Sequence, residues 1–142
     1  MAAIKRFQTF TQTGSTADVY SDLTTSFAIH PNKLDLLVST NEEAVKRSIL
    51  NILFTNRGER LFNPTFGSNM QALLFENISP QTESAIKSYI ETSIENEEPR
   101  AQLIDVVVAA LPDENAYAAT VVFSIINNSD PIILDFLLNR IR

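Results

Sequence analysis

Pro99 marks the point at which the second half of this chain changes from a helical pattern to a β pattern. Residues 80–96 repeat apolar side chains at the spacing of an amphipathic helix, whereas residues 103–111 are rich in Val and Ile. Proline lacks an N–H group and clashes with a preceding helical turn, so we expect the helix to stop here and Glu98 to be extended. A stiff joint between a helix and a strand is therefore predicted at Glu98-Pro99-Arg100.

The chain as a whole is predicted to have an α+β fold, with about three helices packed against a mostly antiparallel β-sheet. Of its 142 residues, 44% are hydrophobic and 20% are charged, which fits a single globular domain over residues 1–142. Residues 1–22 are rich in Thr, Ser and Gln and lack a sustained period, so we expect an extended N-terminal arm there.

The first helix is expected to begin after Thr40, where Thr40-Asn41-Glu42-Glu43 matches the capping box. In that motif the hydroxyl of Thr40 and the carboxylate of Glu43 each bond a backbone amide at the helix start. The helix should end before Gly58, a residue suited to a helix C-cap. Its apolar stripe is formed by Val45, Ile49, Ile52 and Leu53.

Two further helices are predicted before Pro99. A short apolar one covers residues 70–75, and a longer one begins at Ser79-Pro80, a capping hydroxyl followed by proline at the first helical position. The longer helix should run to about Asn96. The side chains that it is expected to bury are Ile86, Tyr89, Ile90 and Ile94.

The β pattern predicts two hairpins and a last strand. Residues 26–29 and 34–38 flank a turn, and residues 103–111 and 117–126 flank the turn at 112–115. After a turn at residues 127–131, residues 132–141 form the last strand.

That last strand is apolar on both faces. One face carries Leu134, Phe136 and Leu138, and the other carries Ile133 and Leu137. A strand of this kind fits the centre of a sheet that is covered on both sides within the monomer. It also fits an open template that pairs with a strand of a neighbouring subunit, in which case Leu134, Phe136 and Leu138 are candidate contact residues.

Composition argues against several classes of function. Eleven basic residues against seventeen acidic ones give a net charge of −6, which disfavours nucleic acid as a partner. The longest apolar runs are too short for a membrane span, and no secretory signal is visible, so we expect a protein made in a cytoplasm. There is no cysteine, and one histidine cannot build a histidine metal cluster, so neither a metal nor a cofactor is expected.

Two charged segments are the candidate partner-binding sites. Glu98 and Arg100 lie two residues apart on extended chain, so both side chains should leave the same face beside Pro99. Glu59 and Arg60 lie in the loop at residues 56–68. That loop is either a connection whose phenylalanines join the core, or a second half of the Glu98/Arg100 surface.

Catalysis by a pair of carboxylates is the less favoured interpretation. Glu59, Glu76 and Glu98 lie near apolar residues, as a general acid of a glycosidase would. However, arginines flank Glu59 and follow Glu98, which favours the ionised form instead. We therefore expect a protein that is not an enzyme.

The order of motifs resembles a known family. The capped helix is followed by Thr55-Asn56-Arg57-Gly58-Glu59-Arg60, then by Pro64-Thr65-Phe66-Gly67-Ser68, and later by Glu98-Pro99-Arg100 and a Val-rich hairpin. Over residues 23–127 this resembles the small baseplate wedge protein, or sheath initiator, of contractile-tail bacteriophages. Relatives of that family include a baseplate subunit of type VI secretion systems.

The resemblance implies a structural role in a virion. It implies that Glu98, Pro99 and Arg100 contact the helical core bundle of larger wedge subunits. It also implies that the C-terminal strands are offered to the first ring of the tail sheath protein around the tail tube. Tail tube and hub proteins are further candidate partners. A type VI secretion subunit is the alternative. The family has also carried a lysozyme attribution, which no acid pair in this sequence supports.

Overall fold

The computed structural model describes residues 20–24, 26–32, 34–126 and 128–140. Most of the arm predicted at residues 1–22 lies outside these residues, and the part inside already contains a strand. The elements, in chain order, are β1 (Ser21–Leu23), β2 (Val38–Thr40), α1 (Asn41–Phe54), α2 (Met70–Leu73), α3 (Pro80–Glu97), β3 (Ala101–Leu111), β4 (Ala116–Ile125) and β5 (Asn128–Asn139). A short 3₁₀ turn, Pro112–Glu114, joins β3 to β4.

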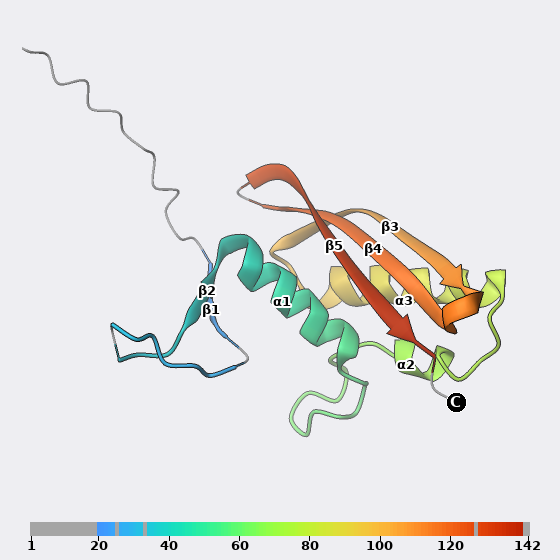
Figure 1. The fold of residues 1–142 in the computed structure, drawn as a ribbon, viewed down its shortest axis with the longest axis horizontal. Helices are drawn as coiled ribbons and strands as arrows, with labels where there is room; N and C mark the ends of the chain where they lie inside the picture. Colours follow the sequence, from blue (N-terminus) through green and yellow to red (C-terminus); the bar gives the residue numbers. More distant parts are fainter. Residues whose placement is uncertain (1–19, 25, 33, 127, 141–142) are drawn as a thin grey trace, which may run out of the picture.

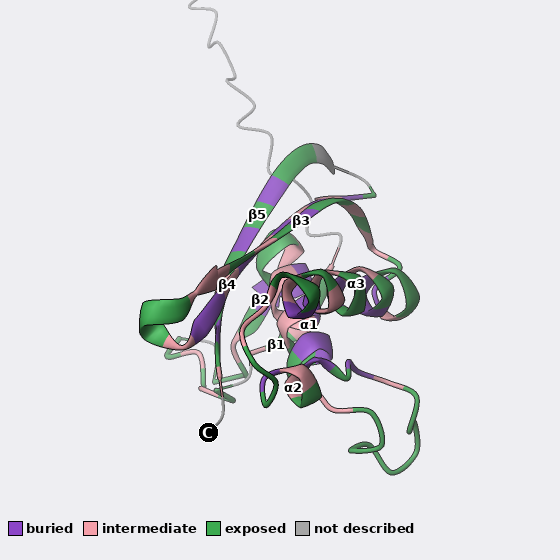
Figure 2. Ribbon diagram, turned by 90° about the vertical axis from the view of Figure 1, so that its right-hand side faces the viewer, coloured by how far each residue is buried: buried purple, intermediate pink, exposed green. Residues whose placement is uncertain are grey.

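The C-terminal half forms an antiparallel sheet in the order β3-β4-β5 (Figure 1). The helices lie on one side of this sheet, which makes two layers (Figure 2). The predicted α+β fold, with three helices and antiparallel sheets, is confirmed.

The core lies between the helices and the inner face of the sheet. Alternate side chains of a strand point to one face, so β4 buries every second residue from Tyr117 to Ile125. Burying a side chain of the size of Ile or Leu stabilises the fold by about 1.5–3 kcal/mol. The helical residues that meet this face include Val45, Ile49, Leu53, Ile86, Ile90 and Ile94.

The N-terminal hairpin differs from the prediction. The paired strands are β1 and β2, and they overlap the predicted strands 26–29 and 34–38 only at Val38, which pairs with Leu23. Within the predicted strands there is one isolated bridge, between Ile29 and Leu36. Phe27 and Leu34 have φ of 47° and 52°, a left-handed conformation that interrupts extended backbone.

The predicted capping box of the first helix is wrong. Thr40 stands at the N-cap position, but its side chain makes no capping hydrogen bond. Asn41 pairs instead with Tyr20, whose amide donates to the Asn41 side chain while the Asn41 amide donates to the Tyr20 carbonyl. A tertiary contact thus replaces the local cap. At the other end, Thr55 rather than a glycine closes the helix.

The third helix begins as predicted. The hydroxyl of Ser79 accepts a hydrogen bond of 3.2 Å from the amide of Thr82, and Pro80 follows at the first helical position. The prediction that Tyr89 is buried is wrong, because its side chain is 36% exposed. It lies at the edge of the apolar stripe, where the period of 3.6 residues leaves a side chain at the boundary with solvent.

The last strand also departs from the prediction. Strand β5 begins at Asn128 instead of residue 132, so part of the predicted turn belongs to the strand. It pairs with β4 and stands at the edge of the sheet rather than at its centre. Its second apolar face is open, with Ile133 and Leu137 exposed.

Candidate functional site

The helix-strand joint at Pro99 holds a tight ion pair. Helix α3 ends at Glu97, and the backbone turns through Pro99 into β3. The Nε and Nη2 of Arg100 donate hydrogen bonds of 2.6 and 2.9 Å to the two carboxylate oxygens of Glu98. The two side chains meet as expected, but across a tight turn and not on extended chain, because the amide of Ala101 donates to the carbonyl of Glu98 at 3.1 Å. Glu98 itself is buried, and Pro99 is exposed.

Arg100 also ties this joint to the N-terminal hairpin. Its Nη1 donates a hydrogen bond of 3.3 Å to Oδ2 of Asp22 in β1. The guanidinium carbon lies 5.6 Å from the centre of the Tyr20 ring. We call Asp22, Ser48, Glu98 and Arg100 the Arg100 cluster. Sequence analysis missed Asp22, because nothing in the local pattern links two residues that lie 78 positions apart.

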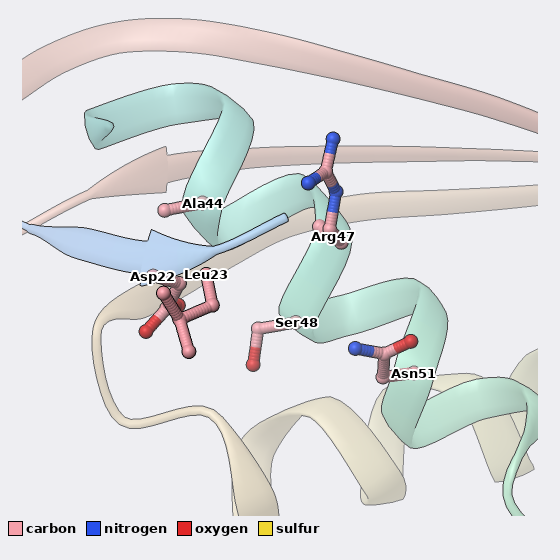
Figure 3. A pocket seen from close by; sticks show the side chains of 6 residues that line it. All are labelled: Asp22, Leu23, Ala44, Arg47, Ser48 and Asn51. Carbon is pink, nitrogen blue, oxygen red and sulfur yellow. The ribbon is translucent and has the colours of Figure 1, made fainter. Parts of the chain in front are cut away.

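The fourth member comes from α1. The hydroxyl of Ser48 lies near the Glu98 carboxylate and helps to lower its pKa. Ser48 and Asp22 line a pocket of about 250 Å³, in which both point to the same side of the helix while Arg47 points away from them (Figure 3). Three segments far apart in the sequence therefore meet at the Glu98–Arg100 pair.

The charge on Glu98 is stabilised despite its burial. Burial alone raises the pKa of a carboxyl group, but here the hydrogen bonds and charge of Arg100, together with the nearby hydroxyl of Ser48, outweigh it. The pKa of Glu98 therefore lies below its usual value, and the pKa of Arg100 is raised, chiefly by the hydrogen bond to Glu98. An ionised, enclosed carboxylate suits structural pairing and is unsuited to a general acid.

Glu59 and Arg60 are not brought to this cluster. They follow the C-terminal end of α1, whereas Asp22 lies beside its N-terminal half (Figure 1). Ser48, the cluster residue on this helix, lies six residues, or about 9 Å along the axis, before the last helical residue Phe54. Glu59 instead accepts a hydrogen bond from the amide of Asn56, and Arg60 stacks on the ring of Phe66. The interpretation of this loop as a second half of the Glu98/Arg100 surface is therefore not supported by the geometry.

The three candidate residues of the last strand point inward. Leu134 and Leu138 are buried in the core, and Phe136 packs edge-to-face on Phe54 at 6.0 Å between ring centres. The outward side chains of β5 include Ile133 and Leu137, which are 58% and 55% exposed. The alternation was visible in the sequence, but which face meets the helices depends on tertiary packing.

The backbone of β5 presents an open edge. The amide of Arg140 donates to the carbonyl of Asn115, the residue before β4, so even-numbered residues of β5 direct their backbone groups toward β4. By alternation, the N–H and C=O groups of Ile133, Asp135 and Leu137 point away from the sheet. Among the described residues, none forms a hydrogen bond with these backbone groups.

A metal site and a membrane-spanning helix are two further features that would bear on function. In residues 20–24, 26–32, 34–126 and 128–140 there is no cluster of three or more His, Cys, Asp or Glu side chains that could hold a metal ion. The helices of these segments include none that is long and apolar enough to cross a membrane.

Comparison with solved structures identifies the fold. A putative tail lysozyme from Geobacter sulfurreducens has a TM-score of 0.69 at 24% identity and covers 75% of this chain and 97% of that one. A chain of the anti-feeding prophage baseplate has a TM-score of 0.61 at 24% identity and covers 87% of each. The baseplate complex of a type VI secretion system gives 0.55 at 14% identity, over 68% of this chain and 93% of that one. At these identities the likeness concerns the fold alone.

Comparison of sequences identifies the family. The family model described as baseplate wedge protein gp25 matches residues 39–128. The baseplate wedge protein gp25 of Enterobacteria phage T4 is 34% identical over 114 residues, which make up 80% of this chain and 86% of that protein. Both matches include the Arg100 cluster from Ser48 onward. On these grounds, the chain belongs to the baseplate wedge protein gp25 family.

Proposed function

We propose that this protein is a structural, non-enzymatic component of a contractile-tail baseplate wedge, which pairs a strand with the first ring of tail sheath protein. The observation that carries the proposal is the open edge of β5. Unpaired backbone groups in a row are a template for a strand of another chain. Membership of the baseplate wedge family supports a location in the tail baseplate of a virion.

The opposite edge of the sheet is less suited to strand pairing. On β3, the amide of Ala110 donates to the carboxylate of Glu83 on α3, at 3.2 Å. The amide of Val106 donates to the side chain of Asp105, at 2.8 Å. Two outward donors of this edge are thus already bonded, and Lys87 of α3 pairs with Asp105 beside them. A sheath strand is therefore expected at β5.

Docking on the larger wedge subunits is assigned to Pro99 and the exposed part of Arg100. The side chain of Arg100 is 26% exposed, whereas that of Glu98 is 3% exposed. Glu98 therefore holds the arginine in place, and a partner meets the arginine and the proline. The tail tube and hub proteins are further candidate neighbours, and no cofactor takes part.

Two alternatives belong to other classes. A type VI secretion subunit would use the same surfaces in a bacterial cell. A cell-wall hydrolase would need a protonated acid in a cleft, and the ionised state of Glu98 does not provide one. Glu59 does not lie beside Glu98, so these two do not form a carboxylate pair.

Truncation after Asp130 would remove buried core residues of β5 as well as its edge, so a point substitution is the sharper test. In Leu137→Pro the new residue lacks an N–H group at a position where that group points outward, so the pairing with β4 is kept. We expect this variant to fold and to enter baseplates, but to initiate about tenfold less sheath assembly. The readout is electron microscopy of baseplates mixed with sheath protein.

The matched control is Val107→Lys, which changes an exposed residue of the same sheet face on β3. It should start sheath normally, whereas Leu137→Lys should not. Equal sheath growth from wild type and Leu137→Pro would refute strand pairing at β5. Release of soluble fragments from peptidoglycan by the wild type would favour the hydrolase.

For docking, Pro99→Asp should fold normally and fail to join wedges.

A further inference from the structure

The loop at residues 56–68 places two apolar side chains almost entirely in solvent. Leu61 is 88% exposed and Phe62 is 97% exposed, the highest values among the large apolar side chains of the described residues. The expectation that the phenylalanines of this loop join the core is wrong for Phe62. The loop projects from the C-terminal end of α1 and stands clear of the β3-β4-β5 sheet (Figures 1 and 2).

The base of the loop is firmly tied to the helices. Ser68 donates its amide to the carbonyl of Thr55 at 2.9 Å and its buried hydroxyl to the carbonyl of Leu53 at 2.7 Å. Asn56 donates its side-chain amide to Gln71 at 2.8 Å. Both ends of the loop are therefore held by the first two helices.

The tip is braced from within. The amide of Gly58 donates to the carbonyl of Pro64 at 2.8 Å, which closes the loop below the tip. Asn63 donates its amide to the carbonyl of Arg60 at 3.3 Å, so Leu61 and Phe62 occupy a tight turn. The guanidinium of Arg60 lies 3.8 Å from the centre of the Phe66 ring. Glu59 and Arg60 thus act as supports of the turn.

We propose that Leu61 and Phe62 form an anchor that inserts into an apolar pocket, bordered by carboxylates, on another protein subunit of the same assembly. Rigid loops lose little conformational entropy on binding, and a buried aromatic side chain at the centre of a contact contributes much of the affinity. The inference goes beyond the proposed function, because neither the β5 edge nor the Arg100 cluster takes part.

The charge around the tip favours such a partner. The loop carries Arg57, Arg60 and Glu59, two positive charges against one negative, whereas the whole chain has a net charge of −6. A carboxylate border on the partner would be attracted by this local excess.

The test places a photo-crosslinking amino acid at position 62 in assembled baseplates. We expect a crosslink to one neighbouring subunit, at a site lined by apolar residues and bordered by Asp or Glu. The control places the same group at position 75, where Phe75 is 61% exposed outside the loop, and should give a different crosslink pattern. A crosslink to lipid or to a second copy of this chain, or no crosslink at position 62, would overturn the proposal.

A pair of variants measures the effect on assembly. Leu61→Ser combined with Phe62→Ser should keep the unfolding midpoint of the wild type and join baseplates at least tenfold less well. Phe75→Ser is the matched control and should join normally.

Arg57→Gln should weaken assembly at low salt and have less effect at high salt. Equal incorporation of the double variant and the wild type contradicts the anchor. Since sheath growth is read separately through Leu137→Pro, failure here and failure of the strand template remain distinguishable.

Discussion

Arg100 binds the carboxylate of Glu98 through two hydrogen bonds of 2.6 and 2.9 Å, and the Glu98 side chain is only 3% exposed. A charge that is removed from water needs a partner that compensates for the lost hydration. Arg100 provides it, and Asp22 and Ser48 complete the set. Residues of this cluster are therefore expected to stabilise the fold as well as to shape the surface.

Glu98→Gln should lower the free energy of unfolding at pH 7 by about 2–3 kcal/mol, because a half-buried guanidinium then loses a charged acceptor. Urea denaturation measures the change. Glu95→Gln is the control, since Glu95 is an exposed residue of the same helix, and should have little effect. A loss as small as that of the control would mean that the ion pair is not stabilising.

The same variant predicts a pH dependence. The pKa of Glu98 in the folded protein lies below its ordinary value of 4.5, so above that value the carboxylate contributes its full stabilisation. As the pH falls from 4.5 through the lower folded value, the group takes up a proton and the contribution disappears. The difference in unfolding free energy between wild type and Glu98→Gln should therefore shrink on acidification. A difference that is constant or grows between pH 7 and pH 3 would contradict this.

Asp22→Asn should loosen the N-terminal hairpin with little change in global stability. The Asp22–Arg100 pair is partly exposed, with side-chain exposures of 44% and 26%, and such pairs contribute about 0–1 kcal/mol. We expect faster amide hydrogen exchange in β1 and β2 and unchanged exchange in β4. Asp113→Asn, in the turn before β4, is the control. Unchanged exchange in β1 and β2 would mean that the hairpin is held by its backbone bonds alone.

Much of the fold was accessible from the sequence, because it depends on local chemistry. Ser79 and Pro80 start α3, Pro99 separates it from β3, and the Val-rich hairpin pairs as predicted. The errors occur where tertiary contacts override local signals. Thr40 loses its capping role to the pairing of Asn41 with Tyr20.

The candidate site was predictable in part. The spacing of Glu98 and Arg100 on either side of a proline indicated that their side chains meet. Burial of Glu98 and the contact to Asp22 were not predictable, because both arise from segments far apart in the chain. Likewise, the sequence contained the two faces of β5, but only the position of the helices decides that Leu134 is inside and Ile133 outside.

Gly67→Ala should destabilise the protein more than Gly58→Ala. Both glycines have positive φ, 100° and 85°, so each substitution introduces backbone strain of about 1 kcal/mol. A Cβ at position 67 would also overlap the carbonyl oxygen of Thr55, whereas position 58 is open. We expect a loss of about 2–3 kcal/mol for Gly67→Ala, measured by urea denaturation. Equal losses for the two variants would show that the contact with Thr55 relaxes without cost.

Tyr117→Phe should leave the protein as stable as the wild type, or more stable by up to about 1 kcal/mol. Tyr117 is fully buried in β4, and its hydroxyl has no hydrogen-bond partner among the described residues. A buried hydroxyl without a hydrogen-bond partner loses its hydration on folding and gains nothing in return. Removing it therefore does not lower the free energy of unfolding. Tyr89→Phe is the matched control, because Tyr89 is partly exposed on α3 and its hydroxyl can remain in water; it should change the unfolding free energy by less than about 0.5 kcal/mol. A loss of more than about 1 kcal/mol in Tyr117→Phe would mean that the hydroxyl is bonded in solution, for instance through an enclosed water molecule.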